Sequence, residues 1–439
     1  MFSGWGRFPV HASIPLAPRT QTELRACLKR HRVIARGNGR AYGDSAIGAN
    51  ATIQMHHFNH MLDFDPDTGV LVAEAGVLLA DIIASFLPRG WFPPVTPGTK
   101  FVTLGGMIAA DVHGKNHHKD GSFGGFIDWI DLMDATGAVH RCSPQQNTQM
   151  FNWTVGGMGL TGVILRAALR LRAVQSAWIK QTTQALPNLD AALAAFEAAG
   201  GATYSVAWID CLSKGPALGR SILMLGEHAA PADLRDDAAR YPFETPVKPT
   251  RSVPFSAPSG MLNRFTVRAF NALYYWQNAR NAGTSLVDWD SYFYPLDAIL
   301  GWNRIYGRKG FMQFQCVLPL ETSSAGLKAL LEATSRAGAG SFLAVLKRLG
   351  PQDSPFSFPM EGYTLALDFP VTPQTTALMA KLDQITLRHG GRFYLAKDAR
   401  MSAQTLRQSD PRVPDFVAMR DEQGLKQPLQ SKQSERLQL

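Results

Sequence analysis

The chain has 439 residues, too many for one ordinary domain, so we expect two. Hydrophobic residues make up 45% of it and charged residues 18%, a balance that is typical of a globular protein and excludes a disordered chain. The formal net charge is +9, yet no block of five like charges occurs. We therefore expect no nucleic-acid partner, and the charge fits an anionic ligand or an anionic membrane surface.

The cysteines and the N-terminal residues limit the cellular compartments in which we expect this protein. Cys27, Cys142, Cys211 and Cys316 form no CxxC pair, so we expect neither a zinc ribbon nor a disulfide framework. The first 15 residues carry no apolar signal segment, and no run of about 18 uncharged apolar residues occurs. The sequence thus predicts a protein that is cytoplasmic or peripheral to the inner membrane, without a transmembrane helix.

Residues 1–175 are rich in glycine and in short apolar runs. The runs predict strands over 52–58, 69–76, 128–142 and 161–174. Apolar residues at helical spacing predict helices over 20–31 and 78–90. We expect this first domain to be α+β.

The pattern changes from residue 176 onward. Helices are predicted over 186–201, 323–338 and 372–391, and strands over 204–211, 221–228, 311–319 and 363–370. This alternation indicates a second α+β domain over 176–391, an antiparallel sheet with flanking helices. The polar segment 392–439 is expected to return and pack on the first domain.

Residues 240–290 are the least regular part. Leu262, Phe265, Ala269, Leu273 and Trp276 recur at helical spacing. The favoured interpretation is an amphipathic helix whose stripe faces the core. The alternative is a mobile, aromatic-rich flap that touches lipid or covers a lipid-like substrate, since Trp, Tyr and Arg prefer the membrane interface.

Two glycine-rich loops carry the strongest functional signal. They are RGNGRAYGDSA (36–46) and PGTKFVTLGGMIAADVHGKNHHKDGSFG (97–124). Neither is a GxGxxG within a βαβ unit or a GxxxxGK[ST], so we expect no nicotinamide-type Rossmann domain and no P-loop. Glycine lets the backbone approach a ligand closely, and successive amide groups bind anions. Alone, the first loop is more often a turn; together the two loops suggest a cradle for a large phosphorylated cofactor.

The histidines of the second loop could also be metal ligands. His113, His117, His118 and Asp120 are close in sequence, but lysines at 115 and 119 lie between them. Cations beside a divalent metal are unfavourable. We therefore expect no metal site.

Several strings together resemble a known family. Joined to PGT (97–99), TLGG (103–106), ADVHG (110–114) and VGGMGLTGVI (155–164), the first loop resembles the vanillyl-alcohol-oxidase/p-cresol-methylhydroxylase family of FAD enzymes. The most specific string is HGKNHHKDGSFG (113–124), and the resemblance covers nearly the whole chain. GFMQFQ (310–315), WNRIYG (302–307) and YLAKD (394–398) are similar to members that oxidise a polyprenyl-phosphoryl pentose.

The resemblance implies a PCMH-type FAD domain whose loop 36–42 holds the pyrophosphate. The implied cofactor-binding residues are Arg36, Gly37, Asn38, Gly39, Arg40, Ala41, Tyr42, Gly98, Thr103, Leu104, Gly105, Gly106, Ala110, Asp111, Val112, His113, Ile164 and Tyr394. Many oxidases of the family attach flavin through a histidine of the first loop. Arg40 occupies the equivalent place and cannot form that bond, so we expect non-covalent FAD.

The resemblance also implies oxidation of a sugar secondary alcohol to a ketone. Lys397 is the candidate general base, which requires burial or nearby positive charge to lower its pKa. His113 and Lys115 are candidate hydrogen-bond donors to flavin and substrate. Gln313 and Gln315 share one face of a strand, where they form either a polar wall of the site or a solvated face.

Three functions stay open. The first is oxidation of C2 of a polyprenyl-phosphoryl-β-D-ribose, the first half of an epimerisation to arabinose in cell-wall biosynthesis. That function implies a lipid-phosphate substrate, a separate NAD(P)H-dependent keto-reductase and peripheral membrane contact. The second is an aldonolactone or sugar-alcohol oxidase, such as a D-arabinono-1,4-lactone oxidase. The third is a non-catalytic flavin-binding or membrane-surface protein.

Overall fold

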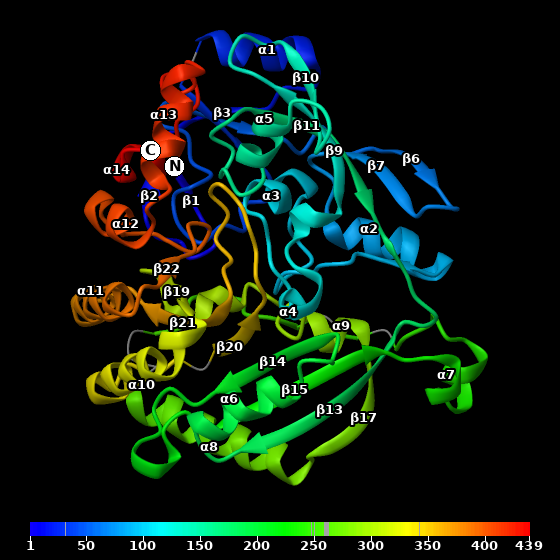
Figure 1. Cartoon of the computed structure of the whole chain (residues 1–439), viewed down its shortest axis with the longest axis vertical. Coiled ribbons are helices and arrows are strands. Elements are labelled where there is room, and N and C mark those ends of the chain that lie inside the picture. The colour runs from blue at the N-terminus through cyan, green and yellow to red at the C-terminus, as the bar shows by residue number, and fades with distance from the viewer. Residues whose placement is uncertain (31, 247, 250, 259–262, 342) are drawn as a thin grey trace.

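A computed structural model describes residues 1–30, 32–246, 248–249, 251–258, 263–341 and 343–439. The N-terminal part contains a parallel sheet of β3 (Ile14–Leu16), β5 (Ala51–Gln54) and β4 (Val33–Arg36). An antiparallel sheet follows, in the order β10 (Val139–Cys142), β9 (Ile127–Met133), β11 (Val163–Arg170), β7 (Val70–Glu74) and β6 (Met61–Asp65). Helices α1 (Gln21–Arg30), α2 (Leu79–Phe86), α3 (Leu104–Ala109) and α5 (Thr148–Thr154) surround these sheets (Figure 1).

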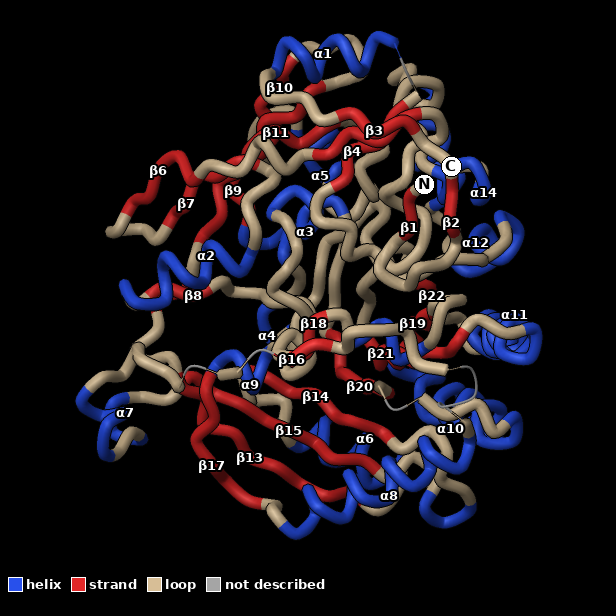
Figure 2. Tube along the Cα trace, turned by 180° about the vertical axis from the view of Figure 1, so that it is seen from behind, coloured by secondary structure: helices blue, strands red, loops and turns tan. Residues whose placement is uncertain are grey.

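The second large element is an eight-stranded antiparallel sheet. Its order is β17 (Gly283–Asp288), β13 (Trp178–Leu186), β15 (Ser221–His228), β14 (Tyr204–Ile209), β20 (Ala344–Leu349), β21 (Gly362–Pro370), β19 (Phe311–Pro319) and β22 (Arg392–Phe393). It fills the lower half of the molecule in Figures 1 and 2. The α+β fold predicted from the sequence is confirmed. We propose the residue ranges 1–175, 176–391 and 392–439 as the domain division, since all strands of this sheet except the two-residue edge strand β22 lie within 176–391.

Helices cover one face of this sheet and leave the other face to the cavity. Helices α6 (Leu189–Ala198), α10 (Leu320–Ala337) and α11 (Pro373–Arg388) share a core with alternate strand residues. Phe314 on β19, Leu346 on β20 and Leu367 on β21 belong to that core and are almost fully buried. Since side chains alternate along a strand, the neighbouring residues of these strands point to the opposite face.

Two predicted elements have different boundaries. The run 128–142 is a hairpin of β9 and β10, because Asp134 accepts hydrogen bonds from the amides of Thr136 and Ala138 and turns the chain. The helix predicted over 186–201 is shorter in the structure, because Leu186 is still part of β13 and pairs with Ser221 of β15. Asn188 then caps α6 by accepting from the amide of Ala191.

The C-terminal segment lies against the N-terminal sheet. It forms α12 (Ala403–Ser409), α13 (Val413–Glu422) and α14 (Lys432–Leu437), beside the N-terminus in both Figure 1 and Figure 2. The amide of Val33 donates to Pro428 at 2.8 Å, and the amide of Gln430 donates back to Val33 at 2.8 Å. The segment therefore extends the edge of β4 and holds the strand that precedes the first glycine-rich loop.

Helix α8 (Arg264–Arg280) contradicts the favoured interpretation of the 240–290 region. It packs on β13 and β15, and its buried residues are Val267 and Asn271. The predicted core stripe faces away from them, with Phe265 70%, Leu273 59% and Trp276 54% exposed. Leu262 of the stripe lies outside the described residues. The stripe was misassigned because the buried face includes a polar residue, Asn271, which donates to Asp210 at 2.8 Å.

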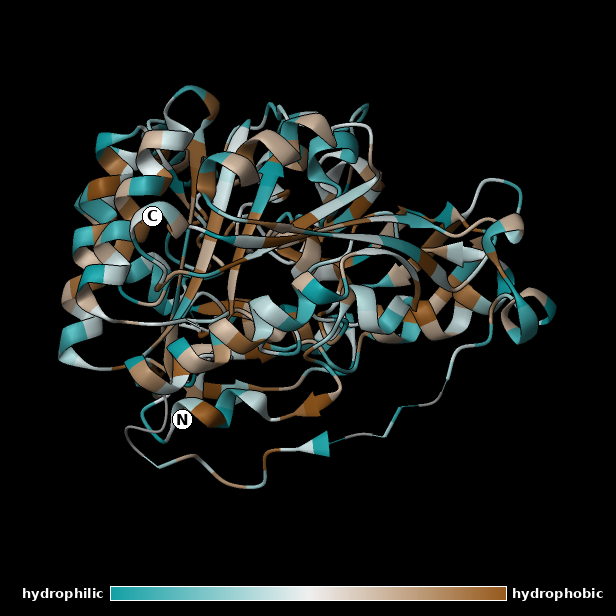
Figure 3. Cartoon of the chain, turned by 90° about the horizontal axis from the view of Figure 1, so that it is seen from below, coloured by the Kyte–Doolittle hydropathy of each residue, from teal (hydrophilic) through white to brown (hydrophobic). Residues whose placement is uncertain are grey.

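An extended segment precedes α8. We call residues 251–258 the strap. Its strand β16 (Arg251–Ser252) pairs in parallel with β18 (Ile299–Leu300). Figure 3 shows the strap along the edge of the molecule, with the hydrophobic β18 coloured brown beside it. Arg304 donates to Val253 at 2.9 Å and to Pro254 at 3.0 Å, which fixes the strap in place.

Candidate active site

A cavity of about 740 Å³ lies between the N-terminal part and the eight-stranded sheet. This volume is in the range of small-molecule and cofactor sites. Its walls come from segments far apart in sequence: residues 35–46, 97–113 and 296–304, strands β19, β20 and β21, and residues 394–397. The two glycine-rich loops and the YLAKD string therefore meet at one site.

One wall is made of backbone, and we call it the glycine wall (residues 36–42 and 97–113). An added Cβ at Gly37 would lie 2.1 Å from Oγ1 of Thr103, so the two loops touch at this position. Thr103 caps α3, accepting from the amide of Gly106. A Cβ at Gly105 would lie 2.8 Å from that of Ala75. The glycines are thus required by the close approach of the two loops to each other and to β7.

Polar side chains lock the two loops together. Asn38 donates to the carbonyl of Phe101 at 2.7 Å, and Nε of Arg40 donates to the same oxygen at 3.4 Å. The Arg40 guanidinium lies 4.1 Å from the ring of Trp5 and 5.4 Å from that of Phe101. Burial lowers the pKa of Arg40, and the charge of Asp297 opposes this. Arg40 therefore places a partly desolvated cation in the glycine wall, available to an anion.

Most of the residues predicted to bind cofactor line the cavity. They are Gly37, Asn38, Gly39, Arg40, Ala41, Tyr42, Gly98, Thr103, Gly105, Gly106, Ala110, Val112, His113, Ile164 and Tyr394.

Three of the predicted residues do not line it. Arg36 points the other way, donating to Ser3 at 2.8 Å and to Ala46 at 3.2 Å, so it braces the loop. Leu104 belongs to the core beneath α3. Asp111 is fully buried and accepts from the Ser122 hydroxyl at 2.8 Å and from other donors. The sequence string does not distinguish residues that face the cavity from those that support it.

The opposite wall carries side chains of the eight-stranded sheet, and we call it the charged wall (β19, β20, β21 and Lys397). Gln313 and Gln315 both line the cavity, as their spacing of two predicts. In the β19–β21 pairing, Gln313 lies opposite Asp368 and Gln315 opposite Ala366. The Gln313 amide donates to the Asp368 carboxylate. Of the two interpretations left open for these glutamines, the wall of the site holds.

Lys397 and Asp368 form the electrostatic centre of the charged wall. Burial raises the pKa of Asp368 well above its usual range, against the hydrogen bond from Gln313 and the charge of Lys397. Burial likewise lowers the pKa of Lys397 well below that of an exposed lysine, opposed by Asp368 and reinforced by Lys347. The Lys397 amine lies 3.8 Å from the centre of the Tyr42 ring, so its protonated form makes a cation–π interaction with that ring. A lysine in this setting can exchange a proton near neutral pH.

His113 joins the two walls. Its Nε2 lies 3.1 Å from the Gln315 amide nitrogen, and its ring packs near those of Tyr394 and Phe358. Burial lowers the pKa of His113 well below its usual range, and the charges of Lys347, His117 and Lys397 add to this. Its Nδ1 is buried without a hydrogen-bond partner among the described residues. If the Gln315 amide donates to Nε2, Nδ1 carries the proton and is a free donor.

Lys115 is not in the cavity wall, in contrast to its predicted role as a donor to flavin or substrate. Its amine donates to the carbonyl of Tyr292 and lies 4.0 Å from that ring. His117 and His118 are held by Gln352 and Ala202, each at 2.8 Å. These three side chains tie the second loop to α9 (Trp289–Phe293), to the turn before β14 and to the loop after β20. Among the described residues, no group of three or more His, Cys, Asp or Glu side chains could hold a metal ion.

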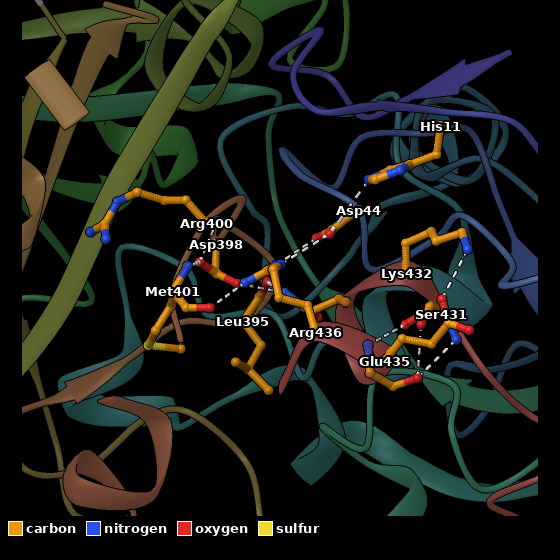
Figure 4. A network of polar contacts seen from close by, with 12 residues as sticks. His11, Asp44, Leu395, Asp398, Arg400, Met401, Ser431, Lys432, Glu435 and Arg436 are labelled. Carbon is orange, nitrogen blue, oxygen red and sulfur yellow. Dashed lines mark hydrogen bonds and ion pairs between the residues drawn. The ribbon is translucent and has the colours of Figure 1, made fainter. Parts of the chain in front are cut away.

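The C-terminal helix fixes the loop that carries Lys397. Arg436 of α14 donates to Asp44 at 2.6 Å, to Asp398 at 2.8 Å and to the Met401 carbonyl at 2.6 Å (Figure 4). Burial acts to raise the pKa of Asp398, but the Arg436 charge and the backbone N–H donors outweigh it and lower the pKa. A Cβ at Gly43 would lie 2.1 Å from the Asp398 carbonyl oxygen. The first glycine-rich loop therefore packs directly on the residue that follows Lys397.

Two charged residues of the site were missed in the sequence. Asp368 and Lys347 both line the cavity; Asp368 is the one charged residue of β21, and Lys347 is followed by Arg348 on β20. The usable signal is their period-two spacing from small or polar neighbours, Ala366 and Thr364 on β21 and Val345 on β20. Without the strand pairing, that signal does not place them opposite the glutamines of β19.

The residues present fit FAD. The glycine wall offers backbone amides and the Arg40 cation to a pyrophosphate, and it has no room for side chains at Gly37 and Gly105. His113 lines the cavity where this wall meets the charged wall, and its Nδ1 has no hydrogen-bond partner among the described residues. An elongated dinucleotide along the glycine wall leaves the polar side chains of the charged wall for a substrate.

Comparisons with known proteins agree with this fit. Residues 14–143 match the family model described as an FAD binding domain. The chain is 36% identical over 432 residues to the decaprenylphosphoryl-β-D-ribose oxidase of Mycolicibacterium smegmatis, covering 95% of this chain and 93% of the relative. It is 32% identical to an uncharacterized protein of Streptomyces coelicolor, covering 78% of this chain and 94% of that one. L-gulonolactone oxidase of Bos taurus is 27% identical over 44% of this chain and 46% of its own length.

Proposed function

Because this chain belongs to the family of FAD-dependent oxidoreductases acting on CH–OH groups that contains decaprenylphosphoryl-β-D-ribose oxidase, we propose that it oxidises the C2 hydroxyl of a polyprenyl-phosphoryl-β-D-ribose to a ketone. The observation that carries the proposal is the meeting of the glycine wall with Lys397, Gln313 and Asp368 in one cavity. The glycine wall is suited to a dinucleotide, and the three side chains are suited to a sugar hydroxyl.

The residues of the charged wall divide the work on the substrate. Oxidation of an alcohol removes a hydride from carbon and a proton from oxygen. FAD, when bound, supplies the acceptor for the hydride. The lowered pKa of Lys397 lets its neutral amine accept the hydroxyl proton. Gln313, held by Asp368, and Gln315, held by Thr364, present their remaining amide atoms to the sugar hydroxyls.

FAD is proposed to bind without a covalent bond. Arg40 occupies the place at which relatives of the wider family carry the linking histidine, and guanidinium does not form that bond. Among the described residues, His113 is the sole histidine that lines the cavity, and its Nε2 is engaged with Gln315. Acid precipitation of the purified protein should leave a colourless pellet and a yellow supernatant.

The rim of the cavity supports a lipid substrate. Ile299 and Leu300 line the cavity and are 36% and 48% exposed, and Phe255 of the neighbouring strap is 71% exposed. Exposed apolar side chains gathered at the edge of a site mark a place for an apolar ligand. A prenyl chain leaving the cavity would lie on this rim.

Helix α8 supports contact with a membrane surface. Its exposed side carries Phe265, Phe270, Leu273 and Trp276, and the helix has three arginines and no acidic residue. Such a surface suits the interface of an anionic bilayer. No helix of the described residues is long and apolar enough to cross a membrane. Asn263, the cap of α8, is six residues from Ala257 of the strap, at most about 22 Å away.

A second enzyme follows from the chemistry. Converting ribose to arabinose requires the C2 ketone to be reduced again from the other face. We propose a separate NAD(P)H-dependent keto-reductase, since neither glycine-rich loop has the nicotinamide fingerprint. The oxidised lipid sugar should accumulate in the absence of that partner.

The test is anaerobic reduction of the flavin, followed by its absorbance. Polyprenyl-phosphoryl-β-D-ribose should bleach the flavin faster than D-arabinono-1,4-lactone at equal concentration. Faster reduction by the lactone would replace the proposal with a soluble-sugar oxidase. A yellow protein that neither compound bleaches would indicate a flavin-binding protein without this activity.

A further inference from the structure

Lys347 is a cation in the charged wall to which the proposed reaction gives no role. It lies on β20, where Val345 and Lys347 line the cavity while Ala344 and Leu346 are buried on the other face. In the β20–β21 pairing it lies opposite Thr364, which in turn contacts Gln315. The amine therefore enters the same space as the two glutamines of β19.

No group of the described residues neutralises Lys347. Other lysines of the chain are paired: Lys100 with Asp290, Lys180 with Asp233 and Lys248 with Asp288. For Lys347 no carboxylate lies within ion-pairing distance, and burial alone lowers its pKa, to about 8. A desolvated charge without a partner is unfavourable, and an anionic ligand would remove that cost.

The positive charge is concentrated at this end of the cavity. The charge of Lys347 reaches His113, Lys115 and Lys397 and lowers the pKa of each. Against the two lysines of the charged wall, Lys347 and Lys397, stands Asp368, whose own pKa burial raises. The charged wall thus has an excess of positive charge where the sugar would lie.

We propose that Lys347 binds the phosphodiester anion of the substrate. This inference rests on the proposed function and gives a binding residue to the phosphodiester, the part of the substrate that the reaction leaves unchanged. In a ribosyl phosphate, the phosphorus atom is three bonds from C2, so its binding group must lie close to the base that serves C2. Lys347 fits this condition, since it lines the same cavity as Lys397 and lies opposite Thr364, which accepts a hydrogen bond from Gln315.

The arginines of the cavity are less suited to this anion. Arg304 and Arg7 donate to the strap, Arg304 to two carbonyls and Arg7 to Ser256. Arg40 is stacked in the glycine wall. A lysine amine is a compact charge with three donors, which suits a phosphodiester whose two free oxygens turn about the ester bonds.

The test compares two substrates on two variants. The substrates are a short prenyl-phosphoryl-β-D-ribose and the matching prenyl β-D-riboside without phosphate. Lys347→Gln should weaken binding of the first, measured as the dissociation constant of the reductive half-reaction, by on the order of 10- to 100-fold. Binding of the second should change less than about twofold. Lys347→Arg should keep part of the preference for the phosphorylated substrate. Lys328→Gln, at an exposed site on α10, is the control and should keep the full preference.

Three results would overturn the inference. One is an equal loss of affinity for both substrates in Lys347→Gln. Another is an unchanged preference for the phosphorylated sugar. The third is a shift in the flavin midpoint potential with the preference kept, which would place the amine on the flavin. Failure of the wild-type protein to oxidise either riboside would instead refute the proposed function and this inference with it.

Discussion

The glycine wall and the charged wall of the cavity use different physical means to hold a ligand. The glycine wall offers backbone amides, and its two loops lie so close together that a side chain at Gly37 would collide with Thr103. The charged wall has buried ionisable groups, Lys397, Asp368 and Lys347, whose pKa values are all displaced by burial. The close-packed glycine wall suits a resident cofactor. The displaced pKa values of the charged wall suit groups that exchange a proton with the substrate.

The difference predicts that changes in the two walls are separable. Substitutions in the charged wall should alter reduction of the flavin and leave its binding unchanged. Substitutions in the glycine wall should alter flavin binding first. Each prediction below tests this separation, and a single variant that changes both properties equally would contradict it.

The largest effect is expected for Lys397→Ala. Loss of a general base lowers the rate by about 10²- to 10⁴-fold, and the flavin spectrum and content should stay as in the wild type. Stopped-flow measurement of anaerobic flavin reduction gives both quantities. Lys381→Ala, at an exposed site on α11, is the matched control and should behave as the wild type. Full reduction by Lys397→Ala would remove this residue from the mechanism.

A methyl group at position 37 should break the glycine wall. The new Cβ of Gly37→Ala would lie 2.1 Å from Thr103 Oγ1, so one loop must move, at a cost of about 1–3 kcal/mol. The dissociation constant of FAD should rise by on the order of 5- to 150-fold. Titration of the apoprotein with FAD measures it. Gly125→Ala, where no atom lies within 4 Å of the new Cβ, should bind FAD normally; weaker binding by both variants would contradict the argument.

The two walls also differ in how far the sequence predicts them. The glycine wall is local: residues 36–42 and 103–106 are short strings, and they can be recognised without knowing what they contact. Gln313 and Gln315 could be assigned to one face because their spacing fits a strand. The remaining partners depend on pairing between distant strands, 55 residues apart for Gln313 and Asp368.

The errors have the same physical origin. Lys115 has the composition of a site residue, but its amine is taken by Tyr292, 177 residues away. The stripe of α8 has the spacing of a core face, yet the helix buries Val267 and Asn271 instead. Periodicity shows that a helix has two faces and does not show which face a distant sheet will cover.

The pH dependence should separate two residues within the charged wall. In the proposed reaction the neutral amine of Lys397 accepts the proton, so the limiting rate of flavin reduction should rise as pH increases through its lowered pKa. Asp368 raises that pKa, so Asp368→Asn should move the midpoint to lower pH. Lys347 lowers that pKa, so Lys347→Gln should move the midpoint to higher pH. Shifts of about one pH unit are expected, and shifts in the same direction for both variants would show that Lys397 is not the titrating group.

The smallest effect on folding is expected at α8, although it lies in the half of the chain that forms the charged wall. Replacing Phe265, Leu273 and Trp276 by serine changes exposed side chains, so each substitution should alter the free energy of unfolding by no more than about 0.5 kcal/mol. Flavin content and reduction by a short-chain substrate should stay unchanged. Co-sedimentation with anionic phospholipid vesicles should decrease, because the apolar contact with the interface is lost.

Leu62→Ser with Val139→Ser provides the matched control for this variant. Both are exposed apolar residues of the N-terminal part, 46% and 39% accessible, and they are not on α8. Their replacement should leave vesicle binding intact. If the control and the α8 variant lose vesicle binding to the same extent, general surface hydrophobicity governs it; if only the α8 variant loses it, the aromatic face of that helix is the part of the molecule that meets the membrane on which a prenyl-linked sugar resides.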